Sequence, residues 1–166
     1  SLVQAKLGNT TAMAFSIEAG CTGFVYMYEI AAGMIASGLH KNALIIGAEK
    51  LSSVANWNDR TTCVLFGDGA GAAVLTSSSV EENGYLGSNM GSDGNYSDIL
   101  HIPGGGTALP ITKENFDEGH QFLQMRGQDV FKLAVNSMAK SARTVLEEAN
   151  LTVDDIDLVI PHQANV

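Results

Sequence analysis

The chain has 166 residues, of which 45% are hydrophobic and 16% are charged, enough to bury the core of one globular domain. The formal net charge of -9 argues against nucleic acid as a partner, because phosphate binding requires clustered lysine and arginine. The sequence shows neither an apolar run of membrane-spanning length nor an N-terminal signal pattern, which predicts a cytoplasmic protein that does not associate with membranes.

The cysteines and the chain ends add two expectations. Cys21 and Cys63 are too few for a disulfide framework, and their spacing from the four histidines does not fit metal ligands, so we expect no bound metal. The sequence opens on Ser1 rather than on methionine and stops at Val166, just after an apparent strand. This pattern predicts that the sequence is part of a longer gene product.

The first predicted elements are a strand, a helix and a strand. Residues 13–18 alternate between apolar and polar side chains, which predicts a strand. Residues 21–37 carry apolar side chains at helical spacing on nearly every side, which predicts a buried helix that ends at Gly38. Residues 42–52 predict a buried strand. This order indicates a parallel crossover unit and an α/β fold.

A glycine-rich stretch follows at residues 66–78, "FGDGAGAAVLTSS". Its glycines resemble a phosphate loop, but such a loop requires a strand before it and a helix after it. Residues 72–77 look like a strand instead. We therefore interpret the glycines as a tight backbone turn close to another element.

A polar stretch at residues 77–84 marks a boundary between two predicted halves, residues 1–80 and 81–166. Both halves use the order strand, helix, strand, although no exact internal repeat is visible.

In the second half we predict a strand within residues 85–94 and the clearest amphipathic helix of the chain over residues 128–149. The last stretch, residues 156–166, begins as a buried strand. The end of that strand delivers His162 into a loop.

Cys21 lies at the predicted start of a helix, between Gly20 and Gly23. The positive end of the helix dipole and the unpaired backbone N–H groups favour the thiolate form, and the glycines permit a sharp turn and the close approach of an acyl group. A buried structural cysteine is the alternative, because free cysteine is commonly a core residue. Cys63 lacks a glycine-framed helix start and is interpreted as a core residue.

Cysteine catalysis requires a histidine that is near in space. His162 is the best candidate, because it follows a predicted strand and stands in a loop with Gln163 and Asn165. The other histidines are interpreted as solvated surface groups: His40, His101 and His120.

Three stretches resemble beta-ketoacyl-acyl carrier protein synthase III, a condensing enzyme of the thiolase fold, in order and in spacing. They are residues 4–35 "QAKLGNTTAMAFSIEAGCTGFVYMYEIAAGMI", 59–75 "DRTTCVLFGDGAGAAVL" and 159–165 "VIPHQAN". The resemblance implies an α/β, thiolase-like layered αβαβα fold. The chain would cover the end of its N-terminal half and the start of its C-terminal half.

The resemblance also implies an activity and its residues. Cys21 would accept an acyl group from acyl-CoA, and His162 would promote the decarboxylation of malonyl-acyl carrier protein, whose carbanion then attacks the acyl-cysteine. Such a condensation starts a fatty-acid chain. Coenzyme A enters as a thioester substrate, and no other cofactor is expected.

Further roles follow from the same resemblance. Arg60 would pack on the adenine of coenzyme A, which suits a planar guanidinium. Gln163 and Asn165 would lie beside the pantetheine tunnel. The family pairs as a homodimer, here through strands near residues 13–18. Its third catalytic residue, an asparagine, would lie beyond Val166, which leaves an inactive partial chain as an alternative.

Other functions stay open. Related thiolase-fold synthases, such as polyketide starter enzymes or 3-hydroxy-3-methylglutaryl-CoA synthase, share the cysteine and the histidine. A cysteine hydrolase that uses Cys21 and His162 belongs to a different class. A third possibility is a non-catalytic scaffold half that only pairs with another subunit.

Overall fold

The computed structural model of the protein describes residues 1–79 and 84–164. The chain divides into two compact units, one made of Ser1–Gly47 with Ala73–Ser77 and the other of Ala48–Ala72 with Ser78–Val166. The boundary predicted between residues 80 and 81 lies outside the described residues.

The first unit is built around helix α2 (Gly23–Ala36), which confirms the helix predicted between residues 21 and 37. The short helix α1 (Leu2–Lys6) precedes it, and the 3-10 helix η1 (Gly20–Thr22) leads directly into it. Gly38 adopts a φ of +77° just after the helix, so the predicted glycine does end it.

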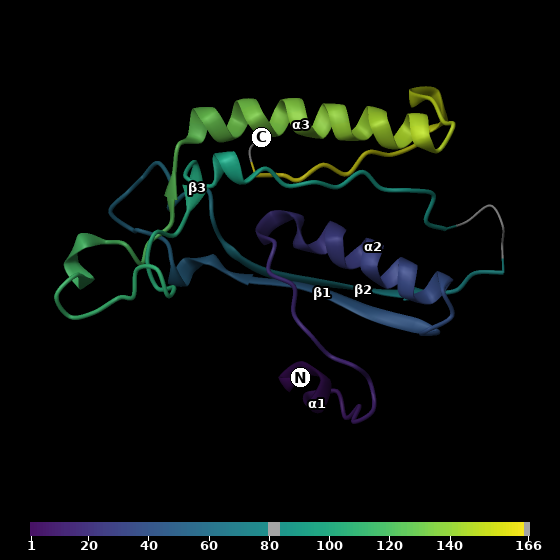
Figure 1. Ribbon diagram of the computed structural model, residues 1–166, viewed down its shortest axis with the longest axis horizontal. Helices are drawn as coiled ribbons and strands as arrows, with labels where there is room; N and C mark the ends of the chain where they lie inside the picture. The colour runs from purple at the N-terminus through teal and green to yellow at the C-terminus, as the bar shows by residue number, and fades with distance from the viewer. Residues whose placement is uncertain (80–83, 165–166) are drawn as a thin grey trace. The chain divides into compact units, whose positions relative to one another are not determined.

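Helix α2 is less buried than its composition predicts. Only Gly23 and Ala31 are buried, whereas Phe24 remains 40% exposed. One side of α2 lies along strand β1 (Asn42–Lys50), where the Phe24 ring is 3.6 Å from the position that a β-carbon on Gly47 would take (Figure 1). The prediction of a fully buried helix is wrong for the described chain, because a helix that is apolar on every side needs covering layers on more than one side.

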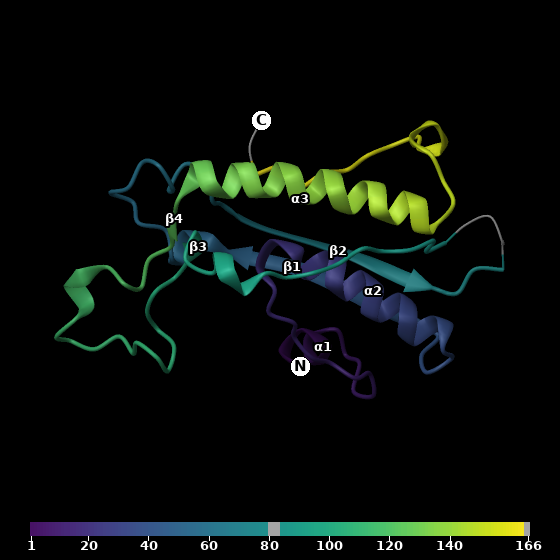
Figure 2. The ribbon, with the colours of Figure 1, turned by 45° about the horizontal axis from the view of Figure 1, so that its top comes forward.

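Strand β1 confirms the strand predicted after the first helix, and it pairs with β2 (Asp68–Thr76) in a two-stranded sheet. The two strands run in opposite directions (Figure 2). β2 continues straight through Gly69 and Gly71, so neither a phosphate loop nor a tight turn forms there. A β-carbon on either glycine would meet no described atom within 4 Å, which also contradicts the predicted close approach of another element.

Residues 13–18 do not form the predicted strand. The segment is irregular, and its largest side chains, Met13 and Phe15, are more than half exposed. A strand requires a neighbour that supplies hydrogen bonds, and no described strand pairs with this segment. The predicted parallel crossover is therefore absent from the described residues.

The second unit contains helix α3 (Gly127–Glu148), which confirms the amphipathic helix predicted over residues 128–149. Residues 85–94 form no strand, against the prediction, but they lie along α3 (Figure 1). The Ser141 hydroxyl donates a hydrogen bond to the carbonyl oxygen of Asn89 (2.7 Å), which fixes this segment on the helix.

Two short antiparallel strands precede α3. In β3 (Leu100–His101) and β4 (Gln124–Met125) the first residue of one strand faces the last residue of the other. The backbone N–H of Arg126 donates to the carbonyl of Ile99 (2.8 Å), which extends this pairing to the start of α3. The 3-10 helices of the second unit are η2 (Leu51–Ser53), η3 (Gly94–Tyr96), η4 (Phe116–Glu118) and η5 (Val153–Asp155). Within the described ranges, a helix with the length and apolar character of a membrane span is not found.

Residues 156–160 are the third predicted strand that does not form. After η5 the chain turns back and runs along α3 (Figures 1 and 2). Leu158, Val159 and Ile160 are exposed, Ile160 to 85%. These residues have the apolar composition of a buried strand, but no described strand supplies the hydrogen bonds that would make them one.

The start of β2 is tied to η2 by the carboxylate of Asp68. It accepts hydrogen bonds from the backbone N–H of Ser52 (2.8 Å) and from the Ser52 hydroxyl (2.6 Å). These bonds, the hydroxyl bond most strongly, lower the pKa of Asp68 below its ordinary value. The ionised carboxylate therefore closes the loop between the two strands.

We expect Asp68→Asn to lower the thermal unfolding midpoint at neutral pH. Because the folded-state pKa is lowered, the contribution of the carboxylate is full above the unfolded pKa of about 4 and is lost as the pH falls through the folded pKa. The midpoint difference from the unmodified chain should thus stay constant above about pH 5 and shrink as the pH falls below about 4, as measured by circular dichroism. Asp117→Asn, at an exposed aspartate, is the control, and a difference that stays constant with pH would contradict the prediction.

Candidate active site

Cys21 is exposed at the junction between the irregular residues 13–19 and helix α2. It is the middle residue of η1, and α2 begins two positions later at Gly23. Gly20 has a φ of +51°, a left-handed conformation that residues with side chains rarely adopt. This turn places the thiol at the start of the helix, as the sequence predicts.

The first turn of α2 presents backbone donors near Cys21. Thr22 precedes the helix, but its hydroxyl donates to the carbonyl of Ala19 (2.8 Å) and makes no capping hydrogen bond to the helix. The first N–H groups of a helix have no partner within the helix and carry the positive end of its dipole. Donors of this kind stabilise a thiolate or an oxyanion that forms beside them.

Arg60 is exposed in a loop organised by the preceding residue, Asp59. The Asp59 carboxylate accepts hydrogen bonds from the hydroxyl (2.6 Å) and the N–H (2.9 Å) of Thr61, and from the hydroxyl of Thr62 (2.9 Å). These bonds, led by that from the Thr61 hydroxyl, lower the pKa of Asp59. Asp59 was not among the predicted functional residues, although an aspartate followed by threonines two and three positions later signals such a turn.

His162 and Gln163 are exposed in the irregular segment that follows Pro161, and Asn165 lies outside the described residues. Cys21 belongs to the first unit, whereas Arg60, His162 and Gln163 belong to the second. Their assembly into one site stays a prediction.

Two of the remaining histidines are not the solvated surface groups that the sequence predicts. His40 is exposed, but His101 and His120 are half-buried, and Nδ1 of each is buried without a hydrogen-bond partner. Nε2 of His120 lies 2.8 Å from the Glu118 carboxylate. The backbone explains part of this burial, because the His120 carbonyl accepts the N–H of Gly104 (2.7 Å) and holds the loop closed. In the described part of the chain, no group of three or more acidic, histidine or cysteine side chains is arranged to hold a metal ion.

Residues 15–94 match the family described as 3-oxoacyl-[acyl-carrier-protein (ACP)] synthase III. Curated relatives named beta-ketoacyl-[acyl-carrier-protein] synthase III are 46% identical in Aliarcobacter butzleri and 50% identical in Campylobacter fetus, each over 164 residues. These alignments cover 99% of this chain and 49% of each relative. The chain therefore spans about half the length of the curated relatives it matches.

Solved structures give the same result. The 3-oxoacyl-[acyl-carrier-protein] synthase III of Aquifex aeolicus is 44% identical with a TM-score of 0.86, and that of Pseudomonas aeruginosa is 37% identical with a TM-score of 0.87. A priming beta-ketosynthase of the R1128 polyketide pathway is 34% identical with a TM-score of 0.82. Each match covers 99% of this chain and 48%, 50% and 48% of the respective structure. The resemblance to synthase III is confirmed, and the chain has the thiolase-like α/β fold of about half of such a protein.

We expect iodoacetamide to modify Cys21 before Cys63 at neutral pH. Cys21 is exposed beside a helix N-terminus, whereas Cys63 is half-buried and follows Thr62, which is only 1% exposed. Mass spectrometry of the folded chain at successive times measures the order. The control is Cys21→Ser, in which only the slow reaction of Cys63 should remain. Equal modification rates for the two thiols would contradict the assignment of Cys21 as the nucleophile.

Gly20→Ala should destabilise the chain by about 1 kcal/mol, because an alanine would have to adopt a left-handed conformation. No described atom lies within 4 Å of the added methyl group, so the backbone is the cause. Gly33→Ala is the matched control: it lies exposed inside α2 in open space and should stabilise by up to about 1 kcal/mol. Urea unfolding measures both, and equal effects of the two variants would contradict the role of Gly20.

Proposed function

We propose that this chain is part of a condensing acyltransferase that starts fatty-acid chains. The enzyme joins the acyl group of an acyl-CoA to malonyl-acyl carrier protein with loss of carbon dioxide. The observation that carries the proposal is the exposed Cys21 at the start of α2, in a chain 46% and 50% identical to proteins named synthase III. Acyl-CoA is a substrate in this reaction, which requires no further cofactor.

In the first step the Cys21 thiolate attacks the carbonyl carbon of the acyl thioester. A new carbon–sulfur bond forms to Cys21, and the bond to the sulfur of coenzyme A breaks. The proton lost from the Cys21 thiol is returned to that leaving sulfur. The backbone N–H groups at the start of α2 stabilise the negative charge on the carbonyl oxygen during the attack.

In the second step the malonyl group loses carbon dioxide, and the electron pair of the broken carbon–carbon bond forms an enolate. His162 donates a hydrogen bond to the enolate oxygen from its neutral ring. The enolate carbon then attacks the acyl group on Cys21, whose thiolate leaves. Arg60 packs on the adenine of coenzyme A, and Gln163 and Asn165 border the pantetheine arm.

The proposal includes the organisation of the protein. Residues 1–80 contribute the nucleophile to one thiolase-like half, and residues 81–166 contribute the histidine to the other. Two copies pair through the segment near residues 13–18, whose exposed, unpaired backbone is suited to extending a sheet. The reaction takes place in the cytoplasm.

A second candidate is chain initiation in a polyketide pathway. The similarity to the priming beta-ketosynthase of the R1128 pathway favours it. The same cysteine and histidine would act, and only the starter acyl group would differ.

The test uses a chimera in which this chain replaces the matching half of the Campylobacter fetus relative. With acetyl-CoA and malonyl-acyl carrier protein, Cys21→Ser should abolish acyl transfer. His162→Ala should keep acylation but slow condensation by about 100-fold or more. Mass spectrometry of the acylated protein and of the ketoacyl product measures both steps.

Cys63→Ala is the matched control for Cys21 and should keep both steps. A folded chimera that hydrolyses the thioester without forming a ketoacyl product would support a cysteine hydrolase and contradict the proposal.

A further inference from the structure

Thr22 stands between the proposed nucleophile Cys21 and helix α2, and its hydroxyl has no role in the steps proposed so far. A threonine just before a helix commonly accepts a hydrogen bond from one of the first helix N–H groups. Thr22 makes no such bond within the described chain. Its backbone is in the right-handed helical region (φ −86°, ψ −6°), where a hydroxyl reaches back to a preceding carbonyl instead.

The partner of the Thr22 hydroxyl is the carbonyl oxygen of Ala19. This oxygen accepts two hydrogen bonds from Thr22, one from the hydroxyl (2.8 Å) and one from the backbone N–H (3.2 Å). Cys21 lies inside the turn of residues 19–22 that these bonds close. The N–H of Gly23 then donates to the carbonyl of Gly20, which connects the turn to α2. The hydroxyl therefore braces the backbone on both sides of Cys21.

The backbone before Cys21 needs this brace more than the helix after it does. Gly20 has a φ of +51°, where the chain has few favourable contacts to hold it. The start of α2 is held from the other side, because the Phe24 ring packs against β1 at Gly47. The turn is thus the part of the junction that can relax, and the bond from Thr22 to Ala19 opposes that relaxation.

The use of this hydroxyl also leaves the helix start without a side-chain acceptor. Ala19, just before η1, has only a methyl group, and Thr22, just before α2, donates its hydroxyl away from the helix. The first turns of η1 and α2 carry no acidic residue. Among residues 19–25, then, no side chain neutralises the positive end of the helix dipole. That end stays available to a negative charge that forms beside Cys21.

We propose that Thr22 is a positioning residue for the acylation of Cys21: its bond to the Ala19 carbonyl holds the turn so that the first N–H groups of the helical stretch face the oxygen of the attacked thioester. Thr22 acts through the backbone and does not touch the acyl group. This inference rests on the proposed function, in which Cys21 accepts that group.

The test compares two reactions of Cys21 in the 166-residue chain. With excess acetyl-CoA, the Cys21 thiolate forms a bond to the thioester carbon, and the sulfur of coenzyme A leaves and takes up the proton. Negative charge forms on the carbonyl oxygen during this attack. With iodoacetamide the thiolate displaces iodide from a methylene carbon, and no such charge forms. Only acetylation therefore depends on N–H groups that face a carbonyl oxygen.

Mass spectrometry at successive times gives both rates for each variant. Thr22→Val removes the hydroxyl and keeps the branched shape; it should slow acetylation of Cys21 by about fivefold and change alkylation by less than about twofold. Thr22→Ser keeps the hydroxyl and should retain the acetylation rate.

Ser37→Ala is the matched control. The Ser37 hydroxyl donates to the carbonyl of Met34 (3.0 Å), which is the same kind of bond at the other end of α2. Its loss should leave both rates unchanged. Circular dichroism checks that each variant folds, and Thr22→Ala supplies the same comparison if Thr22→Val does not fold.

The outcomes separate this inference from the proposed function. Equal slowing of both reactions in Thr22→Val, no slowing of acetylation, or a slow Thr22→Ser would overturn the inference and leave the proposed function standing. If Cys21 of the folded chain is acetylated no faster than Cys21 of the chain unfolded in urea, the inference and the proposed stabilisation by the N–H groups of α2 are both overturned.

Discussion

The left-handed backbone of Gly20 is the constraint on which the arrangement around Cys21 depends. Within three residues the chain changes from an irregular segment to η1 and then to α2. A side chain at this φ costs about 1–2 kcal/mol, so glycine is the residue that permits the change. One backbone angle therefore sets both the exposure of the thiol and its position beside the first N–H groups of α2.

The described chain keeps apolar surface exposed where its sequence predicts burial. Helix α2 packs on a single sheet, and residues 156–160 run along α3 without a strand beside them. Burial of apolar surface contributes about 25 cal/mol per Å², so each covering layer would add substantially to stability. The chain spans about half the length of its relatives, and Cys21 and His162 belong to different units. The arrangement of these two residues in one site is therefore part of the proposed function.

The sequence predicts those elements whose signals are local. Periodicity within one segment predicts helices α2 and α3 and strand β1. The glycines on either side of Cys21 predict its position at the start of a helix. Residues 13–18 and 156–160 have strand composition, but a strand also needs a distant partner, which periodicity does not supply. The burial of His101 and His120 was also missed, because burial depends on contacts between distant residues. For His120 one such contact is the hydrogen bond that its carbonyl accepts from the Gly104 N–H.

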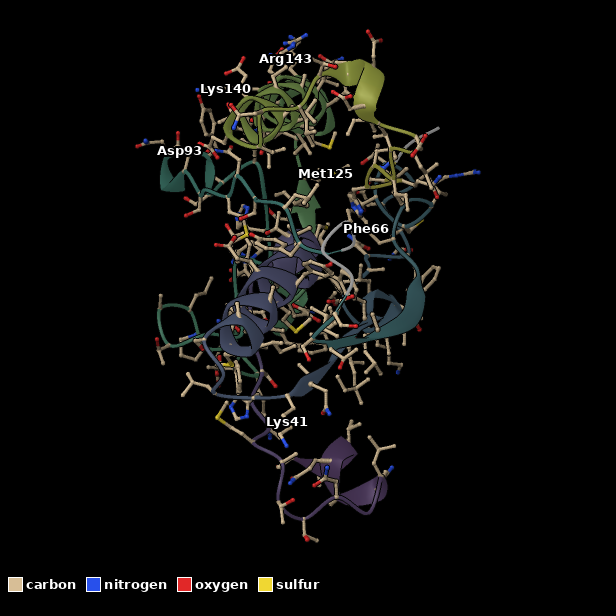
Figure 3. The ribbon with its side chains drawn as sticks, turned by 90° about the vertical axis from the view of Figure 1, so that its right-hand side faces the viewer. Lys41, Phe66, Asp93, Met125, Lys140 and Arg143 are labelled. Carbon is tan, nitrogen blue, oxygen red and sulfur yellow. The ribbon has the colours of Figure 1, made fainter. Side chains whose placement is uncertain are left out.

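Two arginines of the second unit show how local hydrogen bonding decides what an exposed cation does. Arg126 lies 3.1 Å from the Asp98 carboxylate and 3.4 Å from that of Asp129, so its guanidinium helps to hold the start of α3. Helix α3 also carries cations on its outer side, where Lys140 and Arg143 point away from the rest of the unit (Figure 3). Arg60 differs from Arg126, because threonines already occupy the neighbouring carboxylate of Asp59.

The lowered pKa of Asp59 keeps that carboxylate ionised and bonded to the threonines over the physiological range. Asp59 therefore shapes the loop, and the guanidinium N–H groups of Arg60 stay available to donate hydrogen bonds to a ligand. A guanidinium next to a satisfied carboxylate attracts a free anion weakly by charge alone, since the two charges offset each other at a distance. The proposed contact between Arg60 and coenzyme A therefore depends on planar stacking and paired hydrogen bonds.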